Sequence, residues 1–131
     1  MDTEFAAVRA VLQTYLDGLH HSDTERLGQV FHPQPRYVCA TVEPLVNLDM
    51  ATYFPIVDAR PSWASRGDAR RDVVQSIDFA GPNTAFARLT CVIDKRFFTD
   101  FLTLIRTDGA WRIIAKVFHY DPLPADAGTA T

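Results

Sequence analysis

The chain has 131 residues, of which 47% are hydrophobic and 22% are charged, and its formal net charge is −3. This length and composition indicate one globular domain with a buried core and exclude an intrinsically disordered chain. The weak negative charge gives no electrostatic basis for binding nucleic acid or an anionic membrane. No run approaches the roughly 18 apolar residues of a membrane span, and the acidic N-terminus does not resemble a signal peptide. We therefore expect a cytoplasmic protein.

The first part of the chain is predicted to be helical. Apolar residues recur at the spacing of one helical face over Thr3–His20, which predicts a long amphipathic helix. Ser22 followed by Glu25 is a capping-box pattern and predicts a short second helix. Pro33 and Pro35 are expected to stop that helix.

The rest of the chain is predicted to be mainly β-structure. A third helix is expected at Met50–Arg60, with Asp49 as its cap. The predicted strands are Arg36–Thr41, Leu45–Asn47, Arg70–Ala80, Thr84–Ile93, Phe97–Thr107 and Ala110–Tyr120. The residues that follow have the composition of a frayed end. We expect a single domain over residues 1–121 and a flexible tail over residues 122–131.

The last two predicted strands flank Asp108-Gly109, which is a strong signal for a two-residue hairpin turn. Counting back from that turn places Asp100 opposite Val117 and Phe98 opposite His119, all on one face of the sheet. Asp100 and His119 would then be diagonal neighbours. A three-residue loop would instead shift the pairing by one residue.

Helices segregated from an antiparallel sheet predict an α+β domain. A twisted sheet of this length curls, and the N-terminal helix is the element that would close its concave side. The expected fold is a cone-shaped, strongly curved, antiparallel or mixed sheet wrapped around an N-terminal helix layer. The other side of the sheet is too apolar to face water and predicts a homodimer. The residues expected in that interface are Phe101, Ile105, Ile114, Phe118 and Tyr120.

The best candidate for chemistry is the pair formed by Asp100 and His119. A carboxylate that orients an imidazole in an apolar pocket is the minimum arrangement for general acid–base catalysis. Alternatively, the two side chains could simply satisfy each other or cap backbone groups near the end of the sheet. Tyr15 could direct its hydroxyl into the same cavity or pack in the core.

Other residues are weaker candidates. His32 could line the mouth of the cone or interact with a helix end. Trp63, with Tyr53 nearby in sequence, could form a lid over the cavity or an interface anchor. His20 and His21 are adjacent, so their side chains diverge by about 100° on a helix and cannot share a metal. No phosphate-binding loop or nucleophile motif is present, and we expect neither a metal nor a cofactor.

Three features together resemble the nuclear transport factor 2-like superfamily: the first helix, Phe-His-Pro at Phe31–Pro33, and Asp-Gly-Ala-Trp at Asp108–Trp111. The chain is most similar to the SnoaL-like branch and, within it, to small bacterial proteins that carry the label "putative lumazine-binding". The resemblance covers nearly the whole chain and implies the cone fold. It implies no single function, since this fold hosts isomerases, dehydratases, cyclases, binding proteins and assembly domains.

The chain departs from the ketosteroid-isomerase-like members in one respect. These enzymes have a carboxylate base on the first strand, where this chain has Val38-Cys39-Ala40. Tyr15 matches their oxyanion-stabilising tyrosine, but a tyrosine alone does not abstract a proton at neutral pH. The isomerase mechanism is therefore incomplete here.

Three functions remain open. The first is binding of a small apolar or heterocyclic molecule in the cone. The second is a cofactor-independent lyase or isomerase (a dehydratase, isomerase or cyclase) acting on a small cyclic carbonyl substrate, with His119 as acid or base, Asp100 orienting it and Tyr15 polarising an oxygen. The third is a dimeric assembly domain that binds nothing. The expected ligand-binding residues are Tyr15, His32, Tyr37, Cys39, Tyr53, Trp63, Leu89, Cys91, Asp100, Leu102 and His119.

Overall fold

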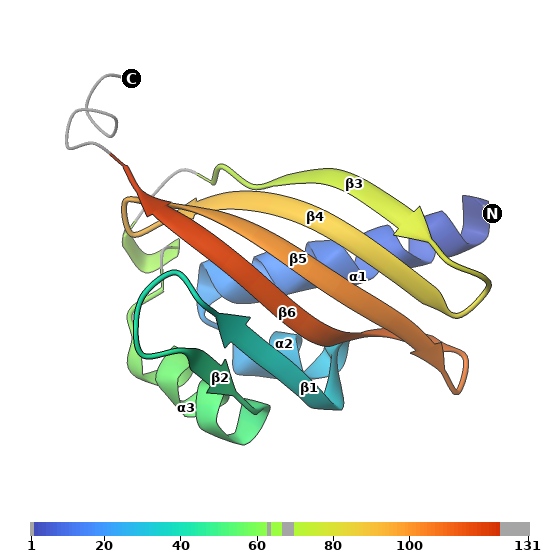
Figure 1. The fold of residues 1–131 in the computed structure, drawn as a ribbon, viewed down its shortest axis with the longest axis horizontal. Coiled ribbons are helices and arrows are strands. Elements are labelled where there is room, and N and C mark those ends of the chain that lie inside the picture. Colours follow the sequence, from blue (N-terminus) through green and yellow to red (C-terminus); the bar gives the residue numbers. More distant parts are fainter. Residues whose placement is uncertain (1, 63, 67–69, 124–131) are drawn as a thin grey trace.

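The computed structural model describes residues 2–62, 64–66 and 70–123 (Figure 1). Its helices are α1 (Asp2–His21), α2 (Thr24–Val30) and α3 (Met50–Ala59), with a short 3-10 helix η1 (Ala64–Arg66). Its strands are β1 (Phe31–Cys39), β2 (Val46–Leu48), β3 (Val73–Phe79), β4 (Thr84–Ile93), β5 (Arg96–Thr107) and β6 (Ala110–Pro122). No helix in these ranges is long and apolar enough to cross a membrane.

The six strands form one curved, mixed sheet in the order β2-β1-β6-β5-β4-β3. β1 and β6 run parallel, and the other neighbouring strands are antiparallel. α1 crosses one face of the sheet, which we call the inner face, and α2 and α3 gather near the edge formed by β1 and β2 (Figure 1). The predicted α+β cone is confirmed. The opposite side is called the outer face below.

The core lies between α1 and the inner face. Alternating residues of the central strands point toward the helix, because side chains on a strand alternate between faces. The fully buried residues of α1 and the central strands are Val8, Leu12, Tyr15, Ala87, Leu89, Leu102, Leu104 and Ile113. They belong to one continuous hydrophobic cluster.

Two local predictions about α2 are wrong. Its N-cap is Asp23, whose carboxylate accepts hydrogen bonds from the backbone N–H groups of Glu25 and Arg26 at 3.1 and 3.2 Å. Ser22 instead has a positive φ of 49° in the turn between the helices. α2 also ends before Pro33 and Pro35, which lie inside β1. Their lack of an N–H group is tolerated because the pairing with β6 is irregular between Phe31 and Arg36.

The two-residue turn at Asp108-Gly109 is confirmed, but the pairing beyond it is not. Thr107 pairs with Ala110, and both turn residues have positive φ values, 53° and 76°. Farther along, Leu104 pairs with Ile113, whereas Thr103 pairs with Ala115. Ile114 is therefore an extra residue, a β-bulge in β6.

The bulge reverses the faces assigned to the end of β6. Asp100 lies opposite Phe118, and His119 lies opposite Thr99. Phe118 is 8% exposed and faces inward, and Tyr120, two residues later in β6, lies on the same face. The assignment of both residues to the outer, dimer-forming face is therefore wrong. Pro122 is the last residue of β6, and the Leu123 N–H group donates to the Lys95 carbonyl at 2.9 Å. The first residue of the predicted tail over residues 122–131 is thus part of β6, and residues 124–131 lie outside the described residues.

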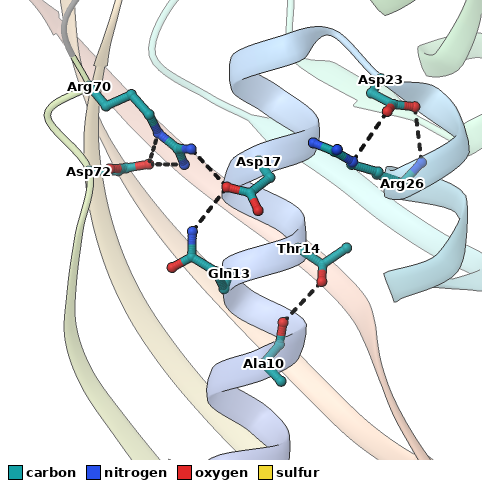
Figure 2. A network of polar contacts seen from close by, with 8 residues as sticks. All are labelled: Ala10, Gln13, Thr14, Asp17, Asp23, Arg26, Arg70 and Asp72. Carbon is teal, nitrogen blue, oxygen red and sulfur yellow. Dashed lines mark hydrogen bonds and ion pairs between the residues drawn. The ribbon is translucent and has the colours of Figure 1, made fainter.

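An ion-pair network ties the C-terminal half of α1 to the segment that leads into β3 (Figure 2). The Arg70 guanidinium donates to Asp17 at 2.7 Å and to Asp72 at 2.6 Å, while Gln13 also donates to Asp17, at 3.0 Å. At the other end of α1, Glu4 accepts hydrogen bonds from Arg106 at 2.9 Å and from the Trp111 indole at 2.6 Å. The helix is thus fixed to the sheet near both of its ends.

The close approach of α1 and α2 generates a prediction about Gly18. A Cβ at Gly18 would lie 2.8 Å from Leu27 Cδ2, and Leu27 is fully buried. We expect Gly18→Ala to lower the free energy of unfolding by about 1 kcal/mol, because overpacking the core outweighs the gain in helix propensity. Gly28→Ala is the matched control, since its Cβ would meet only Phe54, at 3.8 Å. It should raise the free energy of unfolding by up to about 1 kcal/mol in urea titrations. Stabilisation by both substitutions would contradict this account.

We propose that the outer face pairs with a second copy of the chain. Phe86, Phe101 and Val117 are 40%, 42% and 47% exposed on neighbouring strands there, an apolar group that a second copy would remove from water. Phe101→Asp should convert the dimer to a folded monomer by light scattering and circular dichroism. Val42→Asp, at an exposed position outside the sheet strands, should leave the dimer intact. A wild-type monomer, or a dimeric Phe101→Asp variant, would refute the proposal.

Candidate functional site

A buried carboxylate lies in the middle of the inner face. Asp100 is 1% exposed, and its position on β5 points inward like that of Leu102 and Leu104. In the sheet it pairs with Leu89 of β4 on one side and with Phe118 of β6 on the other. A carboxylate in such surroundings is costly unless other groups compensate its charge.

Tyr15 of α1 is the first of those groups. Its hydroxyl donates a hydrogen bond of 2.6 Å to Asp100 Oδ2, and its side chain is fully buried. Burial raises the pKa of Tyr15, and the negative charge of Asp100 raises it further. The tyrosine therefore stays protonated and acts as a donor. The pattern of α1 places it here, because Leu12, Tyr15 and Leu16 share the buried side of the helix.

Lys116 of β6 is the second group that compensates the charge of Asp100. It is 4% exposed, and its Nζ lies 4.0 Å from Asp100 Oδ2, within ion-pair range but too far for a hydrogen bond. The ammonium also lies over three aromatic rings, 5.2 Å from the centroid of Tyr15, 5.1 Å from Tyr37 and 4.9 Å from Phe118. Each is within the range of a cation–π interaction.

Lys116 carries its charge despite burial. Burial alone would lower the pKa of its amine, but attraction to Asp100, with smaller contributions from Tyr53, Tyr37 and Cys91, outweighs that effect and raises the pKa. The amine is therefore an ammonium throughout the neutral range. Asp100 and Lys116 form a buried ion pair enclosed by aromatic rings.

One polar atom of this group lacks a partner. Asp100 Oδ1 is buried and accepts no hydrogen bond from any described residue. A carboxylate oxygen can accept two hydrogen bonds, and buried polar atoms are nearly always paired. Oδ1 is therefore available to a hydrogen-bond donor that the described part of the chain does not supply.

Aromatic and sulfur-containing side chains surround the pair. The Tyr37 ring of β1 stacks on the Tyr53 ring of α3, with centroids 4.2 Å apart and planes at 27°. Burial raises the pKa of Tyr37 to about 12. Burial, with the nearby Asp100 charge, also raises the pKa of the Cys91 thiol to about 12. Cys91 is thus a neutral thiol rather than a nucleophile.

The structure brings together most of the ligand-binding residues expected from the sequence. The members that line the inner face near Asp100 are Tyr15, Tyr37, Tyr53, Leu89, Cys91 and Leu102. Cys39 is also buried, at the β1 position that pairs with Phe118. His32 is not in this group and accepts a hydrogen bond at Nδ1 from the backbone of Gln34. Trp63 lies outside the described residues.

The predicted Asp100–His119 pair does not form. His119 is exposed, because the bulge at Ile114 moves it to the outer face. Its Nδ1 contacts the Thr41 hydroxyl at 2.8 Å, and its Nε2 lies 3.0 Å from Asp121 Oδ1. The partner of Asp100 is Lys116, which the predicted register assigned to the outer face. No sequence signal marks the bulge, since no glycine lies near it.

The side chains around Asp100 and Lys116 can support only a few kinds of chemistry. Among the described residues, no group of three or more His, Cys, Asp or Glu side chains could hold a metal ion. The site offers a carboxylate oxygen that can accept a hydrogen bond or a proton, and an ammonium that can donate to a carbonyl or stabilise a developing oxyanion.

The chain is similar to a known protein family and to a curated relative over most of its length. The family model described as "Putative lumazine-binding" matches residues 3–119. A named relative, Aldolase FrzH from Cladobotryum sp., is 25% identical over 122 residues, which cover 92% of this chain and 94% of FrzH.

Three solved structures share the fold. A nuclear transport factor 2-like protein of unknown function from Silicibacter pomeroyi has a TM-score of 0.81 and 20% identity, covering 92% of this chain and 98% of its own. One from Shewanella baltica has a TM-score of 0.80 and 26% identity, covering 92% and 95%. A ketosteroid isomerase-like protein from Erwinia carotovora has a TM-score of 0.72 and 11% identity, covering 92% and 98%. The chain belongs to the family described as "Putative lumazine-binding", within the nuclear transport factor 2-like superfamily.

Proposed function

We propose that this protein binds a small, largely apolar organic molecule at the inner face of its sheet, and that Asp100 recognises the polar part of that molecule. The observation that carries the proposal is Asp100 Oδ1, a buried carboxylate oxygen without a hydrogen-bond partner among the described residues. An unpaired buried acceptor costs about 1–3 kcal/mol, and more when it is charged. A ligand that donates to Oδ1 would remove this cost on binding.

The surroundings of Asp100 support a site that is mostly apolar with few polar groups, as is usual for small-molecule sites. Leu89 and Leu102 are fully buried beside it, and the stacked rings of Tyr37 and Tyr53 lie close to Lys116. Asp100 itself is almost inaccessible. Binding therefore requires the side chains that cover it to move.

The second candidate function is a cofactor-independent enzyme that acts on a small carbonyl compound. It is favoured by the contact between a carboxylate and an ammonium at one buried place, and by the relative named as an aldolase. Asp100 would remove a proton from the carbon next to the carbonyl, and Lys116 would stabilise the resulting enolate oxygen. Lys116 would act as an ammonium and not through an imine, because its raised pKa disfavours the neutral amine.

Lumazine is the probe that tests the first proposal, because it is flat, heterocyclic and carries N–H donors. We expect it to raise the melting temperature of the wild-type protein and to quench its intrinsic fluorescence. Asp100→Asn should weaken lumazine binding by about 10- to 100-fold, the range expected for a hydrogen bond to a charged group. Asp121→Asn is the matched control, since Asp121 is an exposed carboxylate on β6 outside the site. Equal affinity in both variants would show that Asp100 is not the recognition group.

The charge state of Lys116 generates a further prediction. The chain has two lysines, Lys95 and Lys116, and Lys95 is exposed. Reductive methylation with formaldehyde proceeds through an imine, which only the neutral amine forms. In the folded protein Lys116 should react at least about tenfold more slowly than Lys95, because burial hinders access and each unit of raised pKa lowers the neutral fraction tenfold. Peptide mass spectrometry gives both rates, and unfolding in urea should equalise them. Rapid methylation of Lys116 would instead favour imine chemistry.

A further inference from the structure

We infer that the ligand is an uncharged molecule that presents an N–H donor beside a carbonyl acceptor, the edge found on cyclic amides, imides and ureas. The inference rests on the proposed function and narrows it to a chemical class. It follows from the hydrogen bonds that the polar atoms of Asp100 and Lys116 already make, and from the net charge of these two side chains.

The donor half of the edge is set by Asp100. Its Oδ2 already accepts the Tyr15 hydroxyl at 2.6 Å, whereas Oδ1 accepts nothing from the described residues. Tyr15 has a single O–H group, and that group is used on Oδ2. The free position is thus an acceptor, and a donor on the ligand would satisfy it.

The acceptor half of the edge is set by Lys116. Its ammonium has three N–H donors, yet its distance of 4.0 Å from Asp100 Oδ2 is too long for a hydrogen bond. The rings of Tyr15, Tyr37 and Phe118 stabilise its charge without using a lone pair of any oxygen. A carbonyl oxygen of the ligand would give this ammonium a hydrogen-bond acceptor.

The net charge of the site selects against ionic ligands. Asp100 and Lys116 are 1% and 4% exposed, and their charges cancel. A ligand carboxylate would bring a second negative charge against Asp100, and a ligand ammonium a second positive charge against Lys116. Either would leave a buried charge without compensation, which costs several kcal/mol. An uncharged ligand with its donor and acceptor on adjacent atoms adds hydrogen bonds and no net charge.

The aromatic neighbours indicate a flat ligand. Tyr37 and Tyr53 already stack with their ring centroids 4.2 Å apart, and the Phe118 ring lies 4.9 Å from that of Tyr37. Planar heterocycles make such offset-stacked contacts with aromatic side chains. Cyclic imides and ureas fused to an aromatic ring combine this shape with the required edge, and lumazine is one member of that class.

The test compares lumazine with its derivative methylated at both ring N–H positions, which keeps the rings and carbonyls but lacks both donors. Calorimetric titration would be carried out below neutral pH, where lumazine is uncharged. We expect the wild-type protein to bind the methylated compound at least about tenfold more weakly than lumazine. Asp100→Asn should bind the two compounds within about threefold of each other, because the charged acceptor is gone.

The double variant Asp100→Asn/Lys116→Met is the control for loss of binding that is caused by unfolding. It removes both charges together and leaves no buried ion unpaired, so it should stay folded even if a single variant does not. It should bind neither compound detectably. As a test of neutrality, lumazine-6-carboxylate, which keeps the N–H and carbonyl edge and adds a carboxylate, should bind the wild-type protein at least about tenfold more weakly than lumazine.

The outcomes separate this inference from the proposed function. Equal binding of lumazine and its methylated derivative to the wild-type protein, with loss of both in the double variant, would overturn the donor–acceptor edge while leaving small-molecule binding in place. Tighter binding of the carboxylate compound would overturn the requirement for an uncharged ligand. Binding of none of the three compounds to the folded wild-type protein would overturn the inference and count against the proposed function as well.

Discussion

The burial of the Asp100 carboxylate is the constraint on which the inner face depends. A charge at 1% exposure is tolerable only because Tyr15 donates to one of its oxygens and Lys116 supplies the opposite charge 4.0 Å away. Those partners come from α1 and β6, so the site exists only when helix and sheet are docked. The aromatic rings of Tyr37 and Phe118 also stabilise the pair, because they lie within cation–π range of the buried Lys116 ammonium.

The docking of α1 is itself fixed by polar contacts near its two ends. Glu4 accepts from Arg106 and Trp111 at the N-terminal end, and Asp17 accepts from Arg70 at the other (Figure 2). Tyr15 lies only two residues before Asp17. Its hydroxyl is therefore placed by contacts that are independent of the site, as well as by its own burial. This arrangement preorganises Asp100 for a ligand without using the ligand to order the helix.

The sequence was sufficient for the architecture because hydrophobic periodicity and turn chemistry act locally. The period of α1, the Asp49 cap of α3 and the Asp108-Gly109 turn were each readable from a few neighbouring residues. The composition of the site was only partly readable. One extra residue at Ile114 exchanged the faces of everything after it, removing His119 from the site and bringing in Lys116. Bulges depend on the fit of whole strands and carry no fixed residue signature when glycine is absent.

The same pair of charges bears on the choice between binding and catalysis. A buried Asp–Lys pair that already cancels is well suited to recognising an uncharged molecule, since no net charge is created or removed on binding. Proton abstraction would instead move a proton onto Asp100 and leave negative charge on the substrate oxygen, which Lys116 would then have to balance. The proposed step would use the protonated form of Lys116, which its raised pKa favours. The difference between the two functions thus lies in the ligand: an N–H group at Oδ1 gives recognition, and an acidic C–H group at the same oxygen gives chemistry.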